Sequence, residues 1–521
     1  MSFVPVRIVA KNYRGFSDSR PLDFEVRPGF TAFVGANNSG KSTVLRLFHE
    51  LRQFFDRSRI IDLLRNSTNG GQLGGELEYL FHDRNERDLS LQLNLISASR
   101  SVTKPKAEPL AEILFEIARN KGGTFTAMSP SFPQSTTPQS RLAGPPGEIL
   151  VNEMIDVLGM LSTAMYVGSF RNVVNEAASN YFDLQIGTSF VGAWQSWKAG
   201  TSKYQIENIL KVSEDIRRIF GFKTFEINSS QSNKTLHVAI DGKSYRLDEQ
   251  GSGLSHFIVV LGNAAMRKPG MILIDEPELG LHPNLQIDFL TSLASYTTGP
   301  VLFSTHSLGL ARSIADNIYY VRANANVRAC ALYEQHPNVS QLIGELSYSS
   351  FQALGFNKII LVEGPTEVRT IQQFLRKLGK DHEVLLISLG GSSLIHGGVE
   401  HELSEFTRIG ARVFALVDSE RSSAMDPLPI DRAGFQASCN AIGIDTLVTQ
   451  RRATENYFTD AAVKSALGDD KVALGHYDSL GKPKRWSKSD NWRIAREMTW
   501  DDIAPTDVGS FLQRVVNAPT T

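Results

Sequence analysis

Cysteine is almost absent from this 521-residue sequence, which has only Cys330 and Cys439, far apart and without C-x-x-C spacing. This scarcity argues against a disulfide framework or a zinc site, and it fits a reducing cytosol in which both residues belong to a core. The sequence also lacks an apolar run long enough for a signal peptide or a membrane span. We therefore expect a cytoplasmic protein without a membrane partner.

An excess of charge is lacking too, because the formal net charge is -1. Such a chain does not coat nucleic acid through a globally basic surface, so any nucleic-acid site must be a local patch. With 41% apolar and 21% charged residues the composition is ordinary for a globular protein, and the length predicts two to four domains. Two stretches depart from this composition: Ser67 to Gly75, predicted as a loop, and Met128 to Gly147, predicted as a flexible excursion.

The central motif is Gly35-Ala36-Asn37-Asn38-Ser39-Gly40-Lys41-Ser42, a complete G-x-x-x-x-G-K-[ST] phosphate-binding loop. It follows the apolar run Thr31 to Val34 and precedes apolar residues at helical spacing, which is the strand, loop and helix context that the motif requires. Backbone N–H groups and the helix N-terminus bind phosphate oxygens, Lys41 reaches the outer phosphates, and Ser42 ligates Mg²⁺. The loop therefore predicts a nucleotide site.

Two later apolar strands predict the rest of this site. Met271 to Ile274 ends in Asp275 and Glu276, one carboxylate suited to hold Mg²⁺ through water and the other to polarise an attacking water. Val301 to Thr305 ends in His306, which is placed to sense a γ-phosphate. We expect these side chains to lie beside the phosphate loop.

Periodicity around this site predicts further elements. Val4 to Val9 and Leu22 to Val26 are expected to form an antiparallel edge that packs against the nucleotide end of a sheet. An antiparallel subdomain and a second lobe are expected from the following segments: strands Leu89 to Leu95, Ala111 to Ile117, Thr124 to Ala127, Lys223 to Asn228 and Thr235 to Ile240, and a helix Gln205 to Phe220 with Ile206, Ile209, Leu210, Val212 and Ile216 on one face. Arg171, after a predicted strand, is either a phosphate or interface contact or a solvated arginine.

The first part of the chain resembles the ATP-binding-cassette ATPases of the structural-maintenance-of-chromosomes (SMC) type, on the phosphate loop, the acidic pair and the histidine. A signature-like Gln250-Gly251-Ser252-Gly253 at a helix start adds to the match, although it is abbreviated and no convincing glutamine loop is present. No long heptad-bearing coiled coil interrupts the chain. The resemblance implies ATP as ligand and a homodimer in which one subunit's signature closes on the other's nucleotide.

A second set of strands carries acidic ends in the C-terminal part. Lys358 to Val362 leads into Glu363 and, within the next helix, Glu367; Ala411 to Val417 leads into Asp418 and Glu420. Because the carboxyl ends of parallel strands meet at one sheet edge, these carboxylates should gather where open α/β sheets bind ligands. Carboxylates held so close repel one another unless a divalent cation binds them.

This C-terminal pattern resembles a Toprim domain, although its acidic pair is Asp418 and Glu420 rather than two aspartates. Arg451 to Phe458, with Glu455, resembles the further acidic motif of the overcoming-lysogenization-defect (OLD) nucleases, which join the same two domains in the same order and include the Gabija nuclease subunit. The family implies a catalytic basic residue near the C-terminus, for which we select Lys488, with Lys484 as the rival. A solvated or phosphate-touching basic loop is an equally good interpretation.

The resemblance and the motifs together predict an α/β protein with an ABC/SMC-like ATPase domain over residues 1–345, including the antiparallel subdomain, and a Toprim domain over residues 355–521. The predicted ATP-binding residues are Gly35, Asn38, Gly40, Lys41, Ser42, Thr43, Ser252, Gly253 and Asp275. The predicted catalytic residues are Glu276, His306, Glu363, Asp418, Glu455 and Lys488. The predicted metal ligands, for Mg²⁺ or Mn²⁺, are Ser42, Asp275, Glu363, Glu367, Asp418, Glu420 and Glu455.

Three functions are compatible with these residues. The first is a nucleotide-regulated, metal-dependent nuclease of antiphage defence, acting on nucleic acid, with DNA favoured over RNA, as a homo-oligomer with an accessory defence protein as a further partner. The second is an ATP-gated sensor or clamp whose Toprim domain binds while a partner is the effector. The third, a topoisomerase or primase, needs a tyrosine domain or a zinc module that the sequence does not contain.

Overall fold

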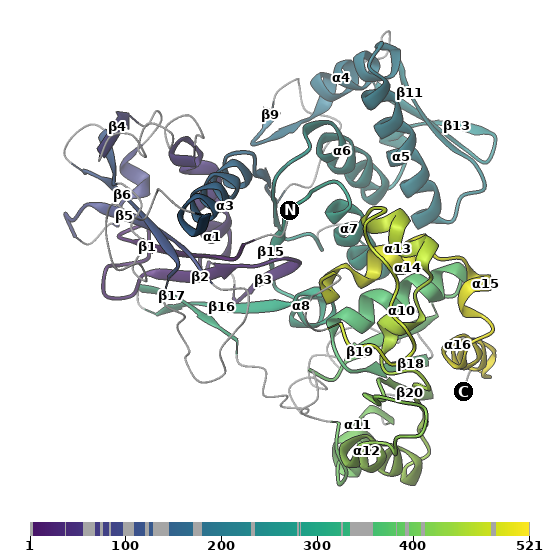
Figure 1. Cartoon of the computed structure of the whole chain (residues 1–521). Helices are drawn as coiled ribbons and strands as arrows, with labels where there is room; N and C mark the ends of the chain where they lie inside the picture. Colours follow the sequence, from purple (N-terminus) through teal and green to yellow (C-terminus); the bar gives the residue numbers. More distant parts are fainter. Residues whose placement is uncertain are drawn as a thin grey trace. The chain divides into compact units, whose positions relative to one another are not determined.

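A computed structural model defines the fold of the chain (Figure 1). The structure describes residues 4–36, 38–55, 68–72, 77–82, 85–96, 109–119, 124–128, 145–169, 180–230, 235–278, 281, 283–324, 327–333, 358–381, 383–390, 395–407, 412–480 and 486–519. Arg171, Lys484 and most of the predicted excursion Met128 to Gly147 lie outside these residues. No helix within the described residues is long and apolar enough to cross a bilayer.

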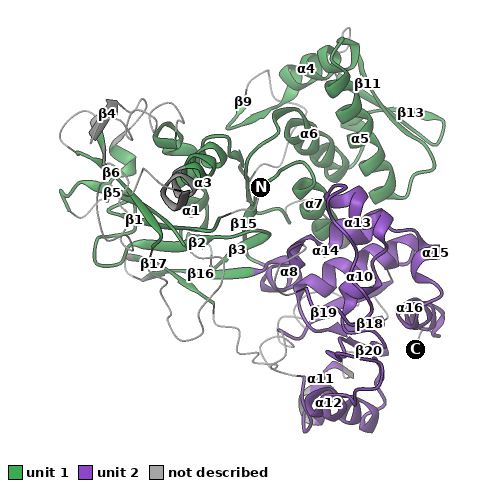
Figure 2. Cartoon of the chain, in the orientation of Figure 1, with its two compact units in different colours: residues 1–306, 317–333 green, residues 307–316, 334–521 purple. Residues whose placement is uncertain are grey.

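The chain forms two compact units, coloured separately in Figure 2. Unit 1 contains Met1–His306 and Asn317–Tyr333, whereas unit 2 contains Ser307–Asp316 and Glu334–Thr521. The short helix α8, Leu308–Ile314, therefore packs with unit 2 although its sequence position is inside the first. The buried Arg369 anchors it, donating hydrogen bonds to the Ile314 carbonyl and, at 2.7 Å, to Asp316.

A mixed six-stranded sheet carries the phosphate loop in unit 1. Its order is β17-β16-β3-β15-β14-β8, with all neighbours parallel except the antiparallel edge strand β17. The strands are β3 Phe30–Val34, β8 Met165–Val167, β14 Ile272–Asp275, β15 Val301–Thr305, β16 Asn317–Asn324 and β17 Val327–Leu332. Their near-continuous apolar runs are typical of strands that are covered on both faces, and β3, β14 and β15 are buried throughout.

A second six-stranded sheet of unit 1 is antiparallel, in the order β2-β1-β5-β6-β7-β4. Its strands are β1 Val6–Lys11, β2 Leu22–Val26, β4 Thr68–Gln72, β5 Leu89–Leu95, β6 Ala111–Ile117 and β7 Thr124–Met128. The predicted antiparallel subdomain is confirmed, and β1 and β2 are part of it. The loop predicted over Ser67 to Gly75 is wrong for Thr68–Gln72, the part of it that the structure describes, because β7 supplies the backbone hydrogen-bond partners that make these residues an edge strand.

Helices and two small antiparallel sheets, β10-β9 and β11-β12-β13, complete unit 1. The helices are α1 Lys41–Glu50, α3 Pro145–Ser162, α4 Gly187–Ala199, α5 Lys203–Phe220, α6 Ser252–Arg267 and α7 Pro283–Ala294, with 3-10 turns at Arg52–Phe55, Leu77–Leu80 and Leu247–Glu249. The remaining strands are β9 Asn180–Tyr181, β10 Leu184–Gln185, β11 Phe225–Ser230, β12 Thr235–Ile240 and β13 Lys243–Arg246. Helix α5 is confirmed, but its predicted apolar face is too wide: Ile206 and Leu210 are exposed, while Ile209, Val212 and Ile216 are buried.

Unit 2 is a three-layer α/β structure on a parallel sheet of order β19-β18-β20-β21. The strands are β18 Lys358–Val362, β19 Val384–Ser388, β20 Arg412–Val417 and β21 Asp445–Val448. The helices are α10 Pro365–Lys377, α11 Glu400–Thr407, α12 Ile430–Ala441, α13 Asp460–Leu467, α14 Asn491–Glu497, α15 Trp500–Ile503 and α16 Asp507–Asn517, with 3-10 turns at Thr454–Tyr457 and Lys488–Asp490.

Successive side chains of β18 point to opposite faces of the sheet, so they pack into two different hydrophobic cores of unit 2. Ile360 and Val362 pack against α10, α13, α14 and α16, whereas Ile359 and Leu361 pack against α11 and α12. Helices therefore cover both faces of the sheet. The predicted site residues of unit 2 lie at the carboxyl ends of its strands. The predicted parallel α/β architecture is confirmed.

Candidate functional sites

The phosphate loop joins β3 to α1. Gly40 caps the helix with φ 108°, and at Gly35 an added Cβ would come within 2.2 Å of the Val321 carbonyl oxygen, so both positions require glycine. Lys41 is buried, and its ammonium donates to the carbonyls of Gly35 and Ala36 at 3.0 and 3.1 Å. Burial lowers the pKa of Lys41, although the carboxylates of Glu276 and Asp275 oppose that effect.

Adjacent strand ends bring the predicted partners to this loop. The Glu276 carboxylate lies 2.9 Å from Nε2 of His306, and the Lys41 ammonium lies 3.2 Å from the same ring nitrogen. Asp275 is buried and accepts a hydrogen bond from Ser304 Oγ, with the Tyr166 hydroxyl at 3.5 Å. Glu276 has φ 51°, a conformation that non-glycine residues rarely adopt and that is frequent at functional sites.

Glu278 is a site residue to which the sequence interpretation gave no role. Its carboxylate accepts hydrogen bonds from Thr305 Oγ1 at 2.7 Å and from the His306 backbone N–H at 2.9 Å. Burial raises the pKa of Glu278, and the neighbouring carboxylate of Glu276 adds to this. Glu278 therefore anchors the end of β15, and its position two residues after Glu276 is the only signal the sequence offers.

The remaining residues predicted to bind the nucleotide lie in the phosphate loop, in helix α1 and at the start of helix α6. Ser42 and Thr43 lie in the first turn of α1, where Thr43 Oγ1 accepts from Arg328, and Asn38 has φ 61° within the loop. Ser252 and Gly253 begin α6, whose N-terminus is exposed. Among the described residues no hydrogen bond joins Ser252 or Gly253 to the phosphate loop.

The carboxylates of unit 2 gather at the carboxyl edge of its sheet. Glu363 follows β18, Asp418 follows the adjacent β20, and the strand order changes direction between these two strands, as it does at the ligand sites of open α/β sheets. Glu367 lies in the first turn of α10, and Glu455 lies in the 3-10 turn after β21. Asp418, Glu455 and Glu367 are all buried, with 2%, 3% and 6% of their surface exposed.

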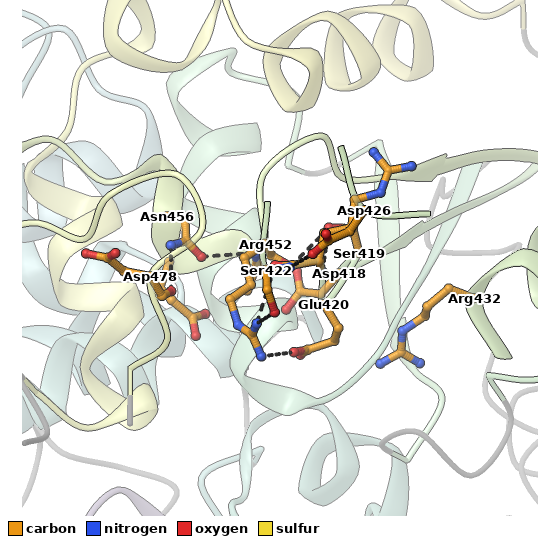
Figure 3. Close-up of polar contacts among 12 residues, drawn as sticks. Asp418, Ser419, Glu420, Ser422, Asp426, Arg432, Arg452, Asn456 and Asp478 are labelled. Carbon is orange, nitrogen blue, oxygen red and sulfur yellow. Dashed lines mark hydrogen bonds and ion pairs between the residues drawn. The ribbon is translucent and has the colours of Figure 1, made fainter. Parts of the chain in front are cut away.

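Polar partners contact Asp418 and Glu455, and Figure 3 shows Asp418 beside Ser419 and Glu420. Asp418 Oδ1 accepts from the backbone N–H and the hydroxyl of Thr454 at 2.9 and 2.8 Å. Glu455 lies 3.4 Å from the Lys488 ammonium and 3.4 Å from the Asn491 amide nitrogen. Lys488, predicted as the basic residue of the site, is thus in contact with a predicted metal ligand.

Two arginines pair with the two outer carboxylates. Arg452 donates to Glu420 at 2.8 Å, and Arg432 lies 3.2 Å from Glu363. Figure 3 shows Arg452 and Arg432 on opposite sides of Glu420. Neither arginine was assigned a role from the sequence, and Arg432 is far from any motif that could have indicated it.

Several carboxylates lie close together at this edge of the sheet, and this shifts the pKa values of the groups around them. Burial raises the pKa of Asp418 well above its usual range, and the carboxylates of Glu367, Glu455 and Glu363 raise it further. Burial likewise raises the pKa values of Glu363 and Glu367. Burial disfavours the charge of Lys488, but the surrounding carboxylates outweigh it and raise the pKa of this lysine.

The donor set fits a hard divalent cation, because Mg²⁺ and Mn²⁺ prefer carboxylate oxygens. The mutual repulsion that raises the pKa of Asp418 is relieved when a cation binds. Across the described part of the chain, however, no three His, Cys, Asp or Glu side chains form a ready-made metal cluster. Binding therefore requires side-chain rotation, and the hydrogen bonds of Glu363 and Glu420 to arginines are the ones that would have to change.

The unit 1 site defines the class of protein. A glycine-rich phosphate loop, a strand-end Asp-Glu pair and a histidine contacting both Lys41 and Glu276 are the parts of a P-loop ATPase-type domain. Residues 30–312 match the family model described as "AAA domain, putative AbiEii toxin, Type IV TA system". Because this match covers more than half of the 521 residues, the chain belongs to that family and carries an ATP-binding ATPase-type domain.

The solved structures to which the chain shows similarity include three SMC heads. They are an SMC head bound to the C-terminal winged-helix domain of ScpA (11% identity, TM-score 0.38, 64% of this chain and 98% of that chain), the SMC head domain from Thermotoga maritima (12%, 0.35, 64% and 100%), and a Pyrococcus furiosus SMC head with an extended coiled coil bound to the ScpA C-terminal domain (11%, 0.36, 66% and 100%). No curated protein matches the chain.

Proposed function

We propose that the chain is an ATP-regulated, metal-dependent nuclease that cleaves phosphodiester bonds. The observation that carries this proposal is the buried Asp418 among Glu363, Glu367 and Glu455, with Lys488 paired to Glu455, at the strand-order change of a parallel sheet. Burying several carboxylates together costs free energy, and a fold retains such an arrangement most readily where it binds cations. An OLD-type assignment of residues 355–521 as a Toprim domain is part of the proposal, as is an ATPase domain over residues 1–345.

Glu363, Glu367, Asp418, Glu420 and Glu455 would hold the metal. One or two bound Mg²⁺ or Mn²⁺ ions would activate water and stabilise the leaving oxygen. Thr454 keeps Asp418 oriented through two hydrogen bonds to one oxygen, which leaves the other oxygen for a ligand. Lys488 offsets the charge of Glu455 and lies where it can stabilise a negatively charged phosphate.

In the ATPase domain, Glu276 is the group suited to accept a proton from attacking water. Its hydrogen bond to His306 links the proton acceptor to the proposed γ-phosphate sensor. Lys41 would bind the β- and γ-phosphates, and Ser42 and Asp275 the Mg²⁺ that accompanies ATP. By analogy with cassette ATPases, Ser252 and Gly253 would complete the nucleotide site of a second subunit, which makes a homodimer part of the proposal.

The test is cleavage of plasmid DNA, single-stranded DNA and transfer RNA by the purified chain with Mg²⁺, Mn²⁺ or EDTA, with and without ATP. We expect metal-dependent cleavage, with DNA cut in preference to RNA. Asp418→Asn should abolish it, whereas Asp445→Asn, a partly exposed carboxylate at the opposite end of the sheet in β21, should not. Wild-type cleavage by the Asp418 variant would refute the nuclease assignment.

A second function is favoured by one observation, namely that the described carboxylates do not form a ready-made metal cluster. In this alternative unit 2 binds nucleic acid without cutting it, and an ATP-gated conformational change signals to an effector partner. Binding without cleavage in every metal would favour it. A role in antiphage defence, an accessory defence protein and a cytoplasmic location belong to either version of the proposal.

A further inference from the structure

Arg432 has hydrogen-bonding capacity that the described residues do not use. It is on the first turn of α12 and only 4% exposed, and its Nη2 lies 3.2 and 3.3 Å from the two carboxylate oxygens of Glu363. Its Nε and Nη1 have no hydrogen-bond partner among the residues that the structure describes, and Nη1 is 3.6 Å from the nearest Asp431 oxygen. A guanidinium carries five N–H donors, so much of this buried cation remains unsatisfied.

The pairing of Arg432 with Glu363 lacks the geometry of the strongest arginine–carboxylate pairs. Those pairs are frequently bidentate, with two N–H groups donating in parallel at about 2.7–2.9 Å. Here one nitrogen is shared between both oxygens at longer distances. Leaving charged donors buried and unpaired costs free energy, so the arrangement is poorly optimised for stability alone.

Arg452, on the other side of the acidic edge, provides an internal comparison. It donates to Glu420 at 2.8 Å, and its Nη1 also lies 3.3 Å from the Arg421 carbonyl and 3.4 Å from Ser422 Oγ. The Nη1 and Nη2 groups of Arg452 therefore both have partners, all in the segment that follows β20. Arg432 differs because its unused N–H groups are buried beside a carboxylate of the acidic cluster.

We propose that Arg432 is a substrate-binding residue that competes with a divalent cation for Glu363 and binds a phosphate of the nucleic-acid strand. When the carboxylate of Glu363 turns to a cation, the guanidinium loses its anionic partner while keeping its charge. The two non-bridging oxygens of a phosphodiester group can accept two N–H groups of a planar guanidinium at once. The inference rests on the proposed function of this site and adds to it the residue that couples metal binding to substrate binding.

The first test measures Mn²⁺ binding by calorimetry, without nucleic acid or nucleotide, for the full chain and three variants. Arg432→Gln removes the competing charge and should bind Mn²⁺ about tenfold more tightly, because one adjacent opposite charge shifts a carboxylate equilibrium by about this factor. Arg432→Lys keeps the charge and should bind like the wild type. Arg514→Gln, whose partner Asp445 lies at the opposite end of β21, should show no change.

The second test measures binding of a short DNA duplex and single strand by fluorescence anisotropy in Ca²⁺, over a range of salt concentrations. Arg432→Gln should weaken binding about tenfold and reduce the salt slope by about one, as expected for one lost phosphate contact. Arg432→Lys should also weaken binding, since a lysine cannot form the bidentate contact. Both measurements are independent of cleavage, so failure of the nuclease assignment alone would leave these results unchanged.

The two tests also separate a structural role from the proposed one. If folded Arg432→Gln binds Mn²⁺ more weakly than the wild type, Arg432 only orients Glu363 and the proposal is wrong. It is equally wrong if DNA affinity is unchanged in both Arg432 variants, or if the wild type binds neither Mn²⁺ nor DNA. If the glutamine variant does not fold, as judged by circular dichroism, the lysine variant decides: its wild-type Mn²⁺ affinity with weakened DNA binding supports the proposal, and any other result overturns it.

Discussion

Asp418→Asn should make the chain more stable when divalent cations are removed. Asp418 is 2% exposed, and both hydrogen bonds from Thr454 go to one oxygen, which the asparagine side chain retains. The substitution keeps the shape of the residue but removes a charge that repels Glu367 and Glu455. Replacing a whole buried ion pair by neutral residues ranges from no effect to a gain of about 4 kcal/mol, and this range is a guide for Asp418 because three carboxylates repel its charge.

Lys488 offsets part of the charge of Asp418, so we expect a gain in the lower half of this range, about 1–2 kcal/mol. For a domain the size of unit 2, a gain of this magnitude corresponds to a rise in Tm of about 2–8 °C. The assay is calorimetric unfolding in EDTA, with Asp445→Asn as the control that should leave Tm unchanged.

The stability that Asp418→Asn gains over the wild type should increase as pH rises. The pKa of Asp418 is raised in the folded chain, so the folded state holds this proton more tightly than the unfolded state, whose aspartates titrate near pH 3.9. The wild type therefore loses the stability contributed by protonated Asp418 as pH rises through the folded pKa, whereas the variant has no titrating group at this position at any pH. The difference in Tm should vanish below about pH 4 and grow as pH rises.

Divalent cations should reverse the order of stability. A ligand at a hundred times its Kd stabilises a folded protein by about 2.7 kcal/mol, which exceeds the expected gain of the variant. Saturating Mn²⁺ should therefore raise the Tm of the wild type above that of Asp418→Asn. Equal stabilisation of both proteins by Mn²⁺, or a variant less stable than the wild type in EDTA at every pH, would refute this reasoning.

Three further outcomes are expected. Lys41→Ala should weaken ATP binding about 10- to 100-fold in a titration with a fluorescent ATP analogue, because a charge-assisted contact to the outer phosphates is lost, and unchanged affinity would contradict that role. Glu276→Gln should retain ATP affinity but lower the hydrolysis rate about 10²- to 10⁴-fold in a phosphate-release assay, whereas an unchanged rate would leave His306 or another group as the proton acceptor. Arg369→Met should lower unfolding free energy by about 2–3 kcal/mol in urea titrations, less than for a fully buried pair because Asp316 is partly exposed, and a neutral effect would show that the pair is dispensable.

Much of the fold was predictable because apolar residues follow the strand and helix periods clearly in this sequence. Buried apolar runs preceded the phosphate loop, Asp275 and His306, and each is a strand of the mixed sheet. The errors arose where tertiary context decides. The glycine-rich segment containing β4 becomes a strand only because β7 is available to pair with it, and Leu210 is exposed because the core reaches only a narrower face of α5.

Candidate site residues were predictable where a strand carries them to a shared edge. This rule placed Glu363 and Asp418 at one edge of a parallel sheet, and in the structure they follow the adjacent parallel strands β18 and β20. It could not indicate their partners, because a partner is defined by the packing of whole helices rather than by local pattern. Arg432 is 69 residues from Glu363 in sequence and reaches it only because α12 covers the sheet face next to β18 and β20.

The charged side chains at the acidic edge of unit 2 are best explained by the cations and phosphates that we propose this edge binds. Carboxylates after β18 and β20 and in the turn after β21 repel one another, and three cations from separate segments, Arg432, Arg452 and Lys488, each contact a different one. The pair of Arg432 and Glu363 is the most buried of the three, and replacing a buried ion pair with well-packed apolar residues is often neutral or stabilising. The presence of these pairs at the carboxyl edge of the sheet supports the proposed site, in which cations and phosphates exchange places with side-chain charges. The opposite effects expected of Arg432→Gln on Mn²⁺ and DNA affinity follow from that proposed exchange.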